Sequence, residues 1–371
     1  MKRTAASSRS FIENRAALVR RARSVFVYGA LTFAAVFSVP GISLADEDGV
    51  SFWLPGLFGS LAAAPQQPGW SFVAINYYDS ISASGSIAAA REITIGNLNP
   101  TVNANLNVNI HANLDFVLLS PSYVFATPVF GGQAAVSMLG IVGTNNTNLN
   151  GTITAGVGGF TATRQGSISQ TTTGVGDLYP MATLRWNSGV SNYMVYATGD
   201  IPVGDYSSTQ LANIGIGHGA VDGGAGYTYF DPKLGHEFSF VTGLTYNLIN
   251  PSTNYQNGID WHLDWGASQF LSKQIFVGAV GYFYDELTPD RGSAPILGPI
   301  ESRVIGVGPQ LGFIFPMGPS QMFLGFKAYG EFDGHDRPSG YNAWVTLAFS
   351  PSGAPPPQTQ SPSLVTKTGV H

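Results

Sequence analysis

The sequence predicts an all-β protein, a transmembrane antiparallel β-barrel of about 12 strands, and three observations lead to it. Apolar and polar residues alternate strictly over residues 105–116, NLNVNIHANLDF. A period of two residues is that of a strand with two different faces, because a helix would spread these residues around its surface. Short turns and longer connections alternate along the chain. No segment after residue 45 resembles a membrane helix, so a closed barrel is the remaining way for this chain to cross a membrane.

The composition excludes several other classes of protein. The chain has 371 residues, of which 12% are aromatic and only 11% charged, which argues against a disordered protein. It has no Cys, so it is neither a disulfide scaffold nor a cysteine-based metal module. Its formal net charge of −5 provides no basic surface for nucleic acid, and no nucleic-acid partner is expected.

Residues 1–45 have the pattern of a secretory signal peptide. Lys2, Arg3 and five further arginines precede residue 24, and an apolar run follows over residues 24–39. Ser43 and Ala45 are small, as a signal-peptidase site requires. The alternative is a single membrane-spanning helix, but the apolar run is shorter than the roughly 20 residues that a helix needs. We therefore expect an exported protein.

The alternation recurs along the rest of the chain and predicts the barrel over residues 70–350. We expect strands at residues 70–79, 103–126, 132–150, 160–187, 190–202, 218–230, 236–249, 258–271, 274–286, 301–315, 321–333 and 340–349. Five short turns are expected at residues 127–131, 187–189, 231–235, 272–273 and 316–320. An even strand number places both ends of the barrel on the short-turn side, which faces the periplasm in outer-membrane barrels. Aromatic residues beside all five turns indicate a membrane-interface girdle.

In such a barrel one strand face contacts lipid and the other lines a wet lumen. We assign the large aromatic and aliphatic face to lipid and the polar face to the lumen. Inward rings could contact an apolar solute, or could simply fill a narrow barrel. The expected solute path comprises Asn107, Asn109, His111, Asp115, Tyr179, Arg185, Tyr196, His262, Asp264, Lys327, Tyr329 and Glu331.

The two ends of the exported chain differ from the barrel. Residues 46–69 are apolar and interrupted by Gly and Pro, so we expect either a plug inside the lumen, carried by Phe52, Trp53 and Phe58, or a periplasmic segment. A misread first strand is a further alternative. Residues 351–371 are rich in Pro and Ser and are predicted to be a disordered tail. This tail is unusual, because outer-membrane barrels usually end on an aromatic strand such as the one that finishes at Phe349.

The sequence contains no recognisable catalytic motif, such as G-x-S-x-G, H-E-x-x-H or a P-loop. No catalytic residue and no cofactor are therefore expected. His262 lies between Asp260 and Asp264 on one strand face, a trio that could bind a metal but is more often a hydrated wall, and no metal site is assigned. A barrel enzyme that acts on lipid would need a Ser and a His together at the membrane edge, and this alternative stays open.

Five short motifs carry a resemblance to a known family. They are FWLPGLFGS at residues 52–60, GVGDLY at 174–179, PVGDY at 202–206, NYQNG at 254–258 and VGPQ at 307–310. In this order they resemble the bacterial family named for the meta-pathway of phenol degradation, over roughly residues 49–350. That family is similar to outer-membrane transporters of hydrophobic compounds, including long-chain fatty-acid channels with an N-terminal plug. It brings no catalytic residues, and the tail and the long basic leader depart from its pattern.

The resemblance and the pattern together give the expected function. We expect an outer-membrane channel of a Gram-negative bacterium for passive uptake of small hydrophobic or aromatic compounds. The alternative is a structural or adhesive surface barrel without transport. The expected partners are outer-membrane lipid, small hydrophobic or aromatic solutes and the outer-membrane insertion machinery.

Overall fold

The structure is a computed structural model that describes residues 51–87, 103–157, 160–292, 301–335 and 337–352. The predicted signal peptide and residues 353–371 of the predicted tail lie outside the described residues. Among the described residues, no helix is long and apolar enough to cross a membrane.

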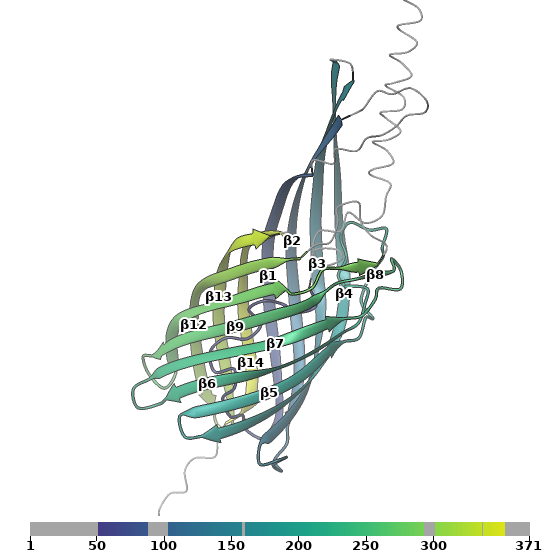
Figure 1. Cartoon of the computed structure of the whole chain (residues 1–371). Helices are drawn as coiled ribbons and strands as arrows, with labels where there is room; N and C mark the ends of the chain where they lie inside the picture. Colours follow the sequence, from purple (N-terminus) through teal and green to yellow (C-terminus); the bar gives the residue numbers. More distant parts are fainter. Residues whose placement is uncertain (1–50, 88–102, 158–159, 293–300, 336, 353–371) are drawn as a thin grey trace, which may run out of the picture.

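The described chain forms a closed antiparallel barrel of 12 strands, as predicted (Figure 1). Each barrel strand pairs with the strands next to it in sequence, and β1 pairs with β14 to close the sheet. A separate two-stranded sheet joins β8 (Tyr255–Gln256) to β11 (Arg291–Gly292) in the loops. The barrel strands are β1 (Gly69–Ile87), β2 (Asn103–Val124), β3 (Gln133–Val157), β4 (Phe160–Ser188), β5 (Ser191–Asp200), β6 (Ala220–Asp231), β7 (His236–Asn247), β9 (Ile259–Phe270), β10 (Ile275–Glu286), β12 (Arg303–Met317), β13 (Ser320–His335) and β14 (Ser339–Pro351).

The five predicted short turns are confirmed. They connect β2 to β3, β4 to β5, β6 to β7, β9 to β10 and β12 to β13. The start of β1 and the end of β14 lie at the same rim, since Phe72 pairs with Phe349. The longer connections, such as residues 201–219, lie at the opposite rim. This is the arrangement expected of an outer-membrane barrel, with the short turns at the periplasmic rim.

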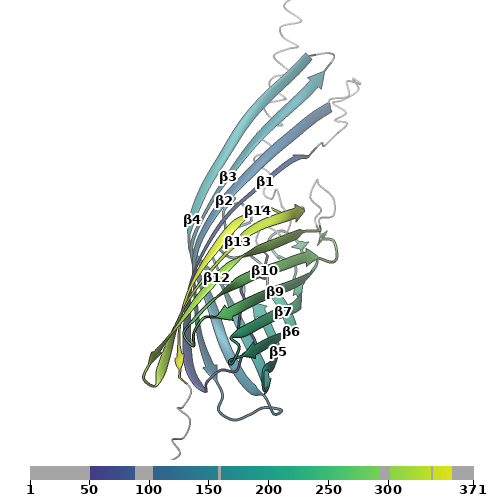
Figure 2. The same cartoon turned by 90° about the vertical axis from the view of Figure 1, so that its left-hand side faces the viewer.

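The first four strands are much longer than the others. They contain 19, 22, 25 and 29 residues, whereas the other barrel strands contain 10 to 16. The pairing of β1 with β14 stops at Ser82 and Ser339, and beyond this level β1 to β4 pair only with one another. Figure 2 shows them continuing past the rest of the barrel as a curved sheet. We call this part, residues 83–87, 103–110, 149–157 and 160–168, the extension.

Around most of the barrel the two faces are those predicted from the sequence. Val195, Phe238 and Val277 are exposed on the outside, where lipid would cover them. Glu237 and Asp264 are buried on the inside. An apolar exterior is stable in acyl chains, and buried polar groups require partners. The inward polar groups find those partners in loops and in the N-terminal segment described below.

The predicted orientation of β2 is wrong. Asn109, His111 and Asp115 are exposed on the outer face, while Phe116 and Leu118 are 3% and 1% exposed and pack inside. The reason is that the barrel interior beside β1 to β3 is filled by a packed apolar cluster, which needs the apolar face of β2. The side chain of Asn107 lies outside the described residues. The cluster that contains Phe116 and Leu118 also contains Ile75, Tyr77, Leu114, Ile141 and Ile214.

A β-bulge in β4 aims an extra side chain into the barrel. Ile141 of β3 lies opposite two residues, Gly176 and Asp177, at a shift in register between the two strands. Both Gly176 and Asp177 are buried, so the alternation of faces changes phase at this point. Bulges bend a strand and redirect a side chain, and this one turns the Asp177 carboxylate inward.

Candidate functional site in the barrel lumen

Residues 51–64 lie inside the barrel and are called the inner segment. Phe52, Trp53 and Ala63 are at most 5% exposed. Their surroundings come from strands far away in sequence. For example, the backbone N–H of Ala63 donates to Thr228 of β6 at 2.9 Å. The segment therefore occupies the lumen that sequence analysis assigned to a solute path.

Two inward carboxylates bind backbone N–H groups of the inner segment. Asp264 of β9 accepts hydrogen bonds from Gly56 at 2.9 Å and from Phe58 at 3.0 Å. Glu237 of β7 accepts from the N–H of Leu61 at 2.9 Å. Hydrogen bonds to charged acceptors are stronger than neutral ones, and a buried carboxylate depends on them. These acids are therefore engaged with the chain itself.

Two inward cations bind the carbonyl groups of the same segment. Lys327 of β13 donates from Nζ to the carbonyls of Gly56 at 2.5 Å, Leu57 at 3.2 Å and residue 58 at 3.3 Å. Arg185 of β4 donates to the carbonyl of Ala62 at 3.4 Å and to Gln66 Oε1 at 3.2 Å. The backbone of the inner segment is thus held on its N–H side by acids and on its C=O side by bases.

Polar side chains from two other motifs meet the inner segment. Gln310 donates from Nε2 to Ser60 Oγ at 2.7 Å and to Ser268 Oγ at 2.9 Å. The hydroxyl of Tyr329 donates to the carbonyl of Gly56 at 3.4 Å. Gly56 has φ of +87°, and a Cβ there would lie 3.0 Å from the Tyr329 ring, so both its backbone angle and its space favour glycine.

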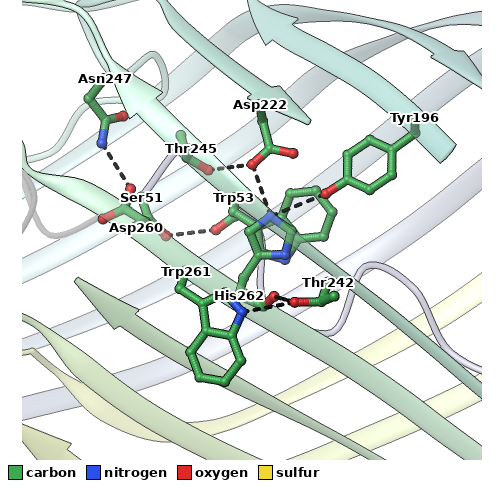
Figure 3. A network of polar contacts seen from close by, with 10 residues as sticks. All are labelled: Ser51, Trp53, Tyr196, Asp222, Thr242, Thr245, Asn247, Asp260, Trp261 and His262. Atoms are coloured by element: carbon green, nitrogen blue, oxygen red, sulfur yellow. Dashed lines mark hydrogen bonds and ion pairs between the residues drawn. The ribbon is translucent and has the colours of Figure 1, made fainter. Parts of the chain in front are cut away.

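The aromatic residues of the inner segment pack against inward rings of the wall. The ring of Trp53 stacks on His262 with centroids 3.6 Å apart and an interplanar angle of 14° (Figure 3). Trp53 also lies 6.0 Å from the ring of Tyr196, and Phe52 lies 5.6 Å from that of Tyr179. Stacked and tilted ring pairs at these separations add to the stability gained from burial.

His262 belongs to a hydrogen-bonded network and is not grouped with metal ligands. Its Nε2 lies 2.9 Å from Asp222 Oδ2 and 3.3 Å from the Tyr196 hydroxyl (Figure 3). Asp260 instead accepts from Asn247 at 2.8 Å, and Asp264 holds the inner segment. No group of three potential metal-ligating side chains occurs in the described ranges. Asp260, His262 and Asp264 lie on one face of β9, as predicted, but each has different hydrogen-bond partners.

The loop of residues 201–219 folds into the barrel mouth and is held by the bulge. Asp177 accepts from the N–H groups of Gly204 and Ile216, each at 2.7 Å. A Cβ on Gly204 would lie 2.6 Å from the backbone of Gly176, so the loop approaches the strand as closely as glycine allows. Ile216 packs in the same buried cluster as Trp53. Motifs 174–179 and 202–206 therefore form one unit above the inner segment.

Glu331 belongs to a second inward network on β10, β13 and β14. It accepts from the Tyr282 hydroxyl at 2.6 Å and from the N–H of Gly340 at 2.8 Å. Asn342 donates to the Tyr282 hydroxyl at 2.9 Å, and the Trp344 indole donates to Asn342 at 2.8 Å. This network ties three strands together beside the inner segment.

A cavity of about 430 Å³ remains between the inner segment and the wall. This volume is within the range of small-molecule binding sites, roughly 300–1,000 Å³. Arg185 and Lys327 are its charged lining residues, and no Asp or Glu lines it. Its apolar lining includes Leu57, Phe58, Val73, Ile75, Leu139 and Met181.

A Ser and a His do meet on the outer face of the barrel. Ser82 Oγ lies 2.8 Å from His111 Nδ1, and Asn113 Nδ2 lies 3.1 Å from His111 Nε2. Asn113 Oδ1 accepts from the Tyr78 hydroxyl at 3.2 Å, which leaves its Nδ2 as the donor to Nε2. These contacts make the pair part of the polar outer surface of β1 and β2.

The predicted site residues thus divide into two groups. Tyr179, Arg185, Tyr196, His262, Asp264, Lys327, Tyr329 and Glu331 face the interior, whereas Asn109, His111 and Asp115 face outward. Several residues that hold the inner segment or the loop are absent from the solute path expected from the sequence. Strand parity points Asp177 and Glu237 inward, and motif membership was a further signal for Asp177 and Gln310. The unselected residues are Asp177, Asp222, Thr228, Glu237 and Gln310.

Comparison with known proteins agrees with this architecture. Residues 94–347 match the sequence profile of a family described as "Putative MetA-pathway of phenol degradation". No curated protein matches the sequence. The matched range covers four of the five motifs and all of the barrel except β1 and the end of β14.

The chain also resembles several solved structures at low sequence identity. A COG4313 outer membrane channel from Pseudomonas putida F1 has 13% identity, covering 78% of this chain and 98% of that chain, with a TM-score of 0.48. A FadL homologue from Pseudomonas aeruginosa has 9% identity, covering 84% and 95%, with a TM-score of 0.31. The transport unit of the autotransporter AIDA-I from Escherichia coli has 12% identity, covering 82% and 95%, with a TM-score of 0.32. The described residues form a closed 12-stranded β-barrel, and the chain belongs to the family described as "Putative MetA-pathway of phenol degradation".

Proposed function

We propose that the barrel is a passive channel for small hydrophobic or aromatic compounds, and that the inner segment is its plug. The observation that carries the proposal is the cavity of about 430 Å³ between that segment and an apolar part of the wall. A solute of this kind would replace contacts of Phe52, Trp53 and Phe58 one at a time. Nothing in the described lumen couples to an energy source, so the solute would move down its own gradient.

The contacts of the inner segment favour a plug that stays attached while it shifts. Asp264, Glu237 and Lys327 each form hydrogen bonds with backbone atoms of the segment. These bonds do not require the side chains of the segment to stay in place. The aromatic contacts of Trp53 and Phe52 are apolar and can be replaced by a solute ring. Residues 1–45 would be the export signal that brings the barrel to the insertion machinery.

Liposome flux tests the proposal. The purified chain is reconstituted, and entry of phenol, benzoate and a medium-chain fatty acid is compared with entry into empty liposomes. We expect flux of at least one of these solutes above the empty control. Deletion of residues 51–64 should raise that flux if the segment is a plug. Flux no greater than that of empty liposomes, with and without the deletion, would reject the channel.

One observation favours the alternative of a structural or adhesive surface barrel. Outward Asn, Thr, Ser and Gln side chains of β2 to β4 form a continuous polar surface, in which Asn146 donates to Thr171 at 2.7 Å and Thr144 lies 2.9 Å from Thr173. Such a surface could bind a partner outside the cell. Planar-bilayer conductance discriminates the two functions, because a permanently closed barrel supports the adhesive one.

A further inference from the structure

We infer that the cavity beside the inner segment binds an organic monoanion, a molecule with an apolar body and one carboxylate, with Arg185 as the residue that selects the charge. This inference rests on the proposed function and names its substrate class. It differs from what the inward charged groups of the described lumen would favour as a whole, because acids such as Asp177, Glu237 and Asp264 outnumber the bases and favour cations or neutral molecules.

The charged residues that line the cavity are basic, whereas most of the inward charged residues of the lumen are acidic. Asp264 and Glu237 bind the N–H side of the inner segment and do not line the cavity. Arg185 and Lys327 bind the C=O side, and both line it. The inner segment therefore separates the acids from the cavity, and a solute in the cavity meets two positive charges without a facing carboxylate.

The two cations are not equivalent. The Lys327 ammonium has three N–H donors, and three backbone carbonyls accept from it. Arg185 has five donors, of which three have partners, namely Thr183, Gln66 and Ala62. Its Nε is buried and has no hydrogen-bond partner among the described residues. Arg185 is thus the cation that still has N–H donors available for a ligand.

Arg185 is also a buried charge that lacks a counter-charge. It is 8% exposed, and no carboxylate of the described residues lies within 4 Å of it. Burial of an unpaired cation is costly, and an anion brought next to it recovers part of that cost. A planar guanidinium also matches a carboxylate in shape, so a carboxylate is favoured over other anions.

The rest of the cavity fits the apolar body of such a molecule. Leu57 and Phe58 of the inner segment face Val73, Ile75 and Met181 of the wall across it. Burying an aryl ring or a short alkyl chain against these side chains releases water from apolar surface. An aromatic acid and a medium-chain fatty acid share this chemistry, so both classes are tested.

Ligand binding to the purified full chain tests the inference with pairs of molecules that share one carbon skeleton, where one member ends in a carboxylate and the other in a hydroxyl group. The pairs are 3-phenylpropionate with 3-phenylpropanol, and octanoate with octanol, with affinities measured by titration calorimetry. We expect each acid to bind about tenfold to hundredfold more tightly than its alcohol. If acid and alcohol bind equally to the unaltered protein, the inference is wrong, and this result needs no variant.

Substitution of Arg185 then locates the preference. Arg185→Gln should reduce the difference in affinity between acid and alcohol to less than about threefold, and Arg185→Lys should keep part of that difference. Arg303→Gln is the matched control, since Arg303 is an exposed arginine paired with Asp333 at 3.2 Å. Each variant is first checked for the folded, heat-modifiable band in SDS gels. A preference for acids that persists in folded Arg185→Gln would overturn the assignment to this residue.

The binding experiment and the flux experiment can fail independently of each other. Flux of neutral phenol without any preference for acids in binding would leave the channel standing and remove this inference. Tight, Arg185-dependent binding of acids without flux of any solute would leave the binding site standing and remove the channel. The relative binding of 3-phenylpropionate and octanoate distinguishes an aromatic from an aliphatic natural ligand.

Discussion

The strands β1 to β4 pass through two regions whose faces are opposite in character. Near the short-turn rim the outer face is apolar, with Trp70, Phe72 and Leu119 exposed. Farther along the same strands the outer face is polar, with His111 and Asp115 exposed, and the apolar side chains point inward. We call the apolar outer band the belt and the polar outer surface the ladder. The ladder comprises Asn76, Tyr78, Ser82, Asn109, His111, Asn113, Asp115, Thr144, Asn146, Asn148, Asn150, Gln165, Ser167, Ser169, Thr171 and Thr173.

The change follows from what each face contacts. In the belt the outside contacts acyl chains, and the inside holds charged groups that bind the inner segment. Beyond the belt we expect the outside to contact water, where Asn, Ser and Thr are stable, and the inside near β2 is filled by Phe116 and Leu118. The same strands therefore have contrasting faces in both regions, and the surroundings of each region decide which face turns inward.

The largest expected effect concerns the interior of the belt. Trp53→Ala would remove a 2% exposed indole that stacks on His262, and truncations of buried Trp destabilise by about 3–5 kcal/mol. The loss should fall mainly on the docking of the inner segment, because the barrel strands keep their own pairing. We expect larger solute flux and larger conductance. Trp70→Ala is the control, because Trp70 is 71% exposed, and it should leave both unchanged. Equal effects of the two variants would show that the interior is not held by Trp53.

The second prediction compares belt and ladder directly. Val195→Arg places a charge on the outer face of the middle of β5, where we expect a loss of about 2–4 kcal/mol in the free energy of unfolding from lipid vesicles. Asn109→Arg places the same charge on the ladder, where water solvates it, and the expected change is below about 0.5 kcal/mol. Urea titration of both variants in vesicles measures the difference. Similar losses would mean that the ladder also lies in acyl chains.

The third prediction concerns the loop at the mouth of the barrel. Asp177→Ala leaves the N–H groups of Gly204 and Ile216 without their acceptor, at about 1–3 kcal/mol for each buried group. We expect the loop of residues 201–219 to be cleaved faster in limited proteolysis, and conductance to fluctuate more. Asp231→Ala is the control, since Asp231 accepts from Lys233 and Leu234 in an exposed short turn at the other rim. In the Asp231→Ala variant, the loop of residues 201–219 should be cleaved at the same rate as in the unaltered protein.

The fold was accessible from the sequence because it depends on local information. The period of two residues and the short turns are each determined by residues that are close together along the chain, and the even strand number follows from counting the strands. All three are confirmed. The inward positions on β4, β5, β9 and β13 followed from the same parity. They include Arg185, Tyr196, Asp264 and Lys327.

The errors arise where a distant part of the chain decides the outcome. The face of β2 depends on an apolar cluster contributed by β1, β3 and the loop residue Ile214, and the sequence of β2 contains no sign of them. The bulge at Gly176 and Asp177 changes the phase of β4 and recruits a loop 27 residues away in sequence. The charge of the cavity depends on which side of the inner segment each charged group binds, and a count of acids and bases does not contain that information.

The smallest expected effect gives the sharpest test of the ladder, because two adjacent residues of β2 should behave oppositely. Asn113 bonds to His111 and Tyr78 on the outer face, and water can replace both partners, so Asn113→Ala should change the free energy of unfolding by less than about 0.5 kcal/mol. Leu114 is 4% exposed and packs inside, so Leu114→Ala should cost about 2–5 kcal/mol. If the face predicted from the sequence were right, Leu114 would contact lipid and Asn113 would lie in the lumen, and the order of the two losses would reverse. Urea unfolding of the two variants in the same vesicles therefore decides between the two orientations, and the sign of the difference suffices even if both losses are smaller than expected.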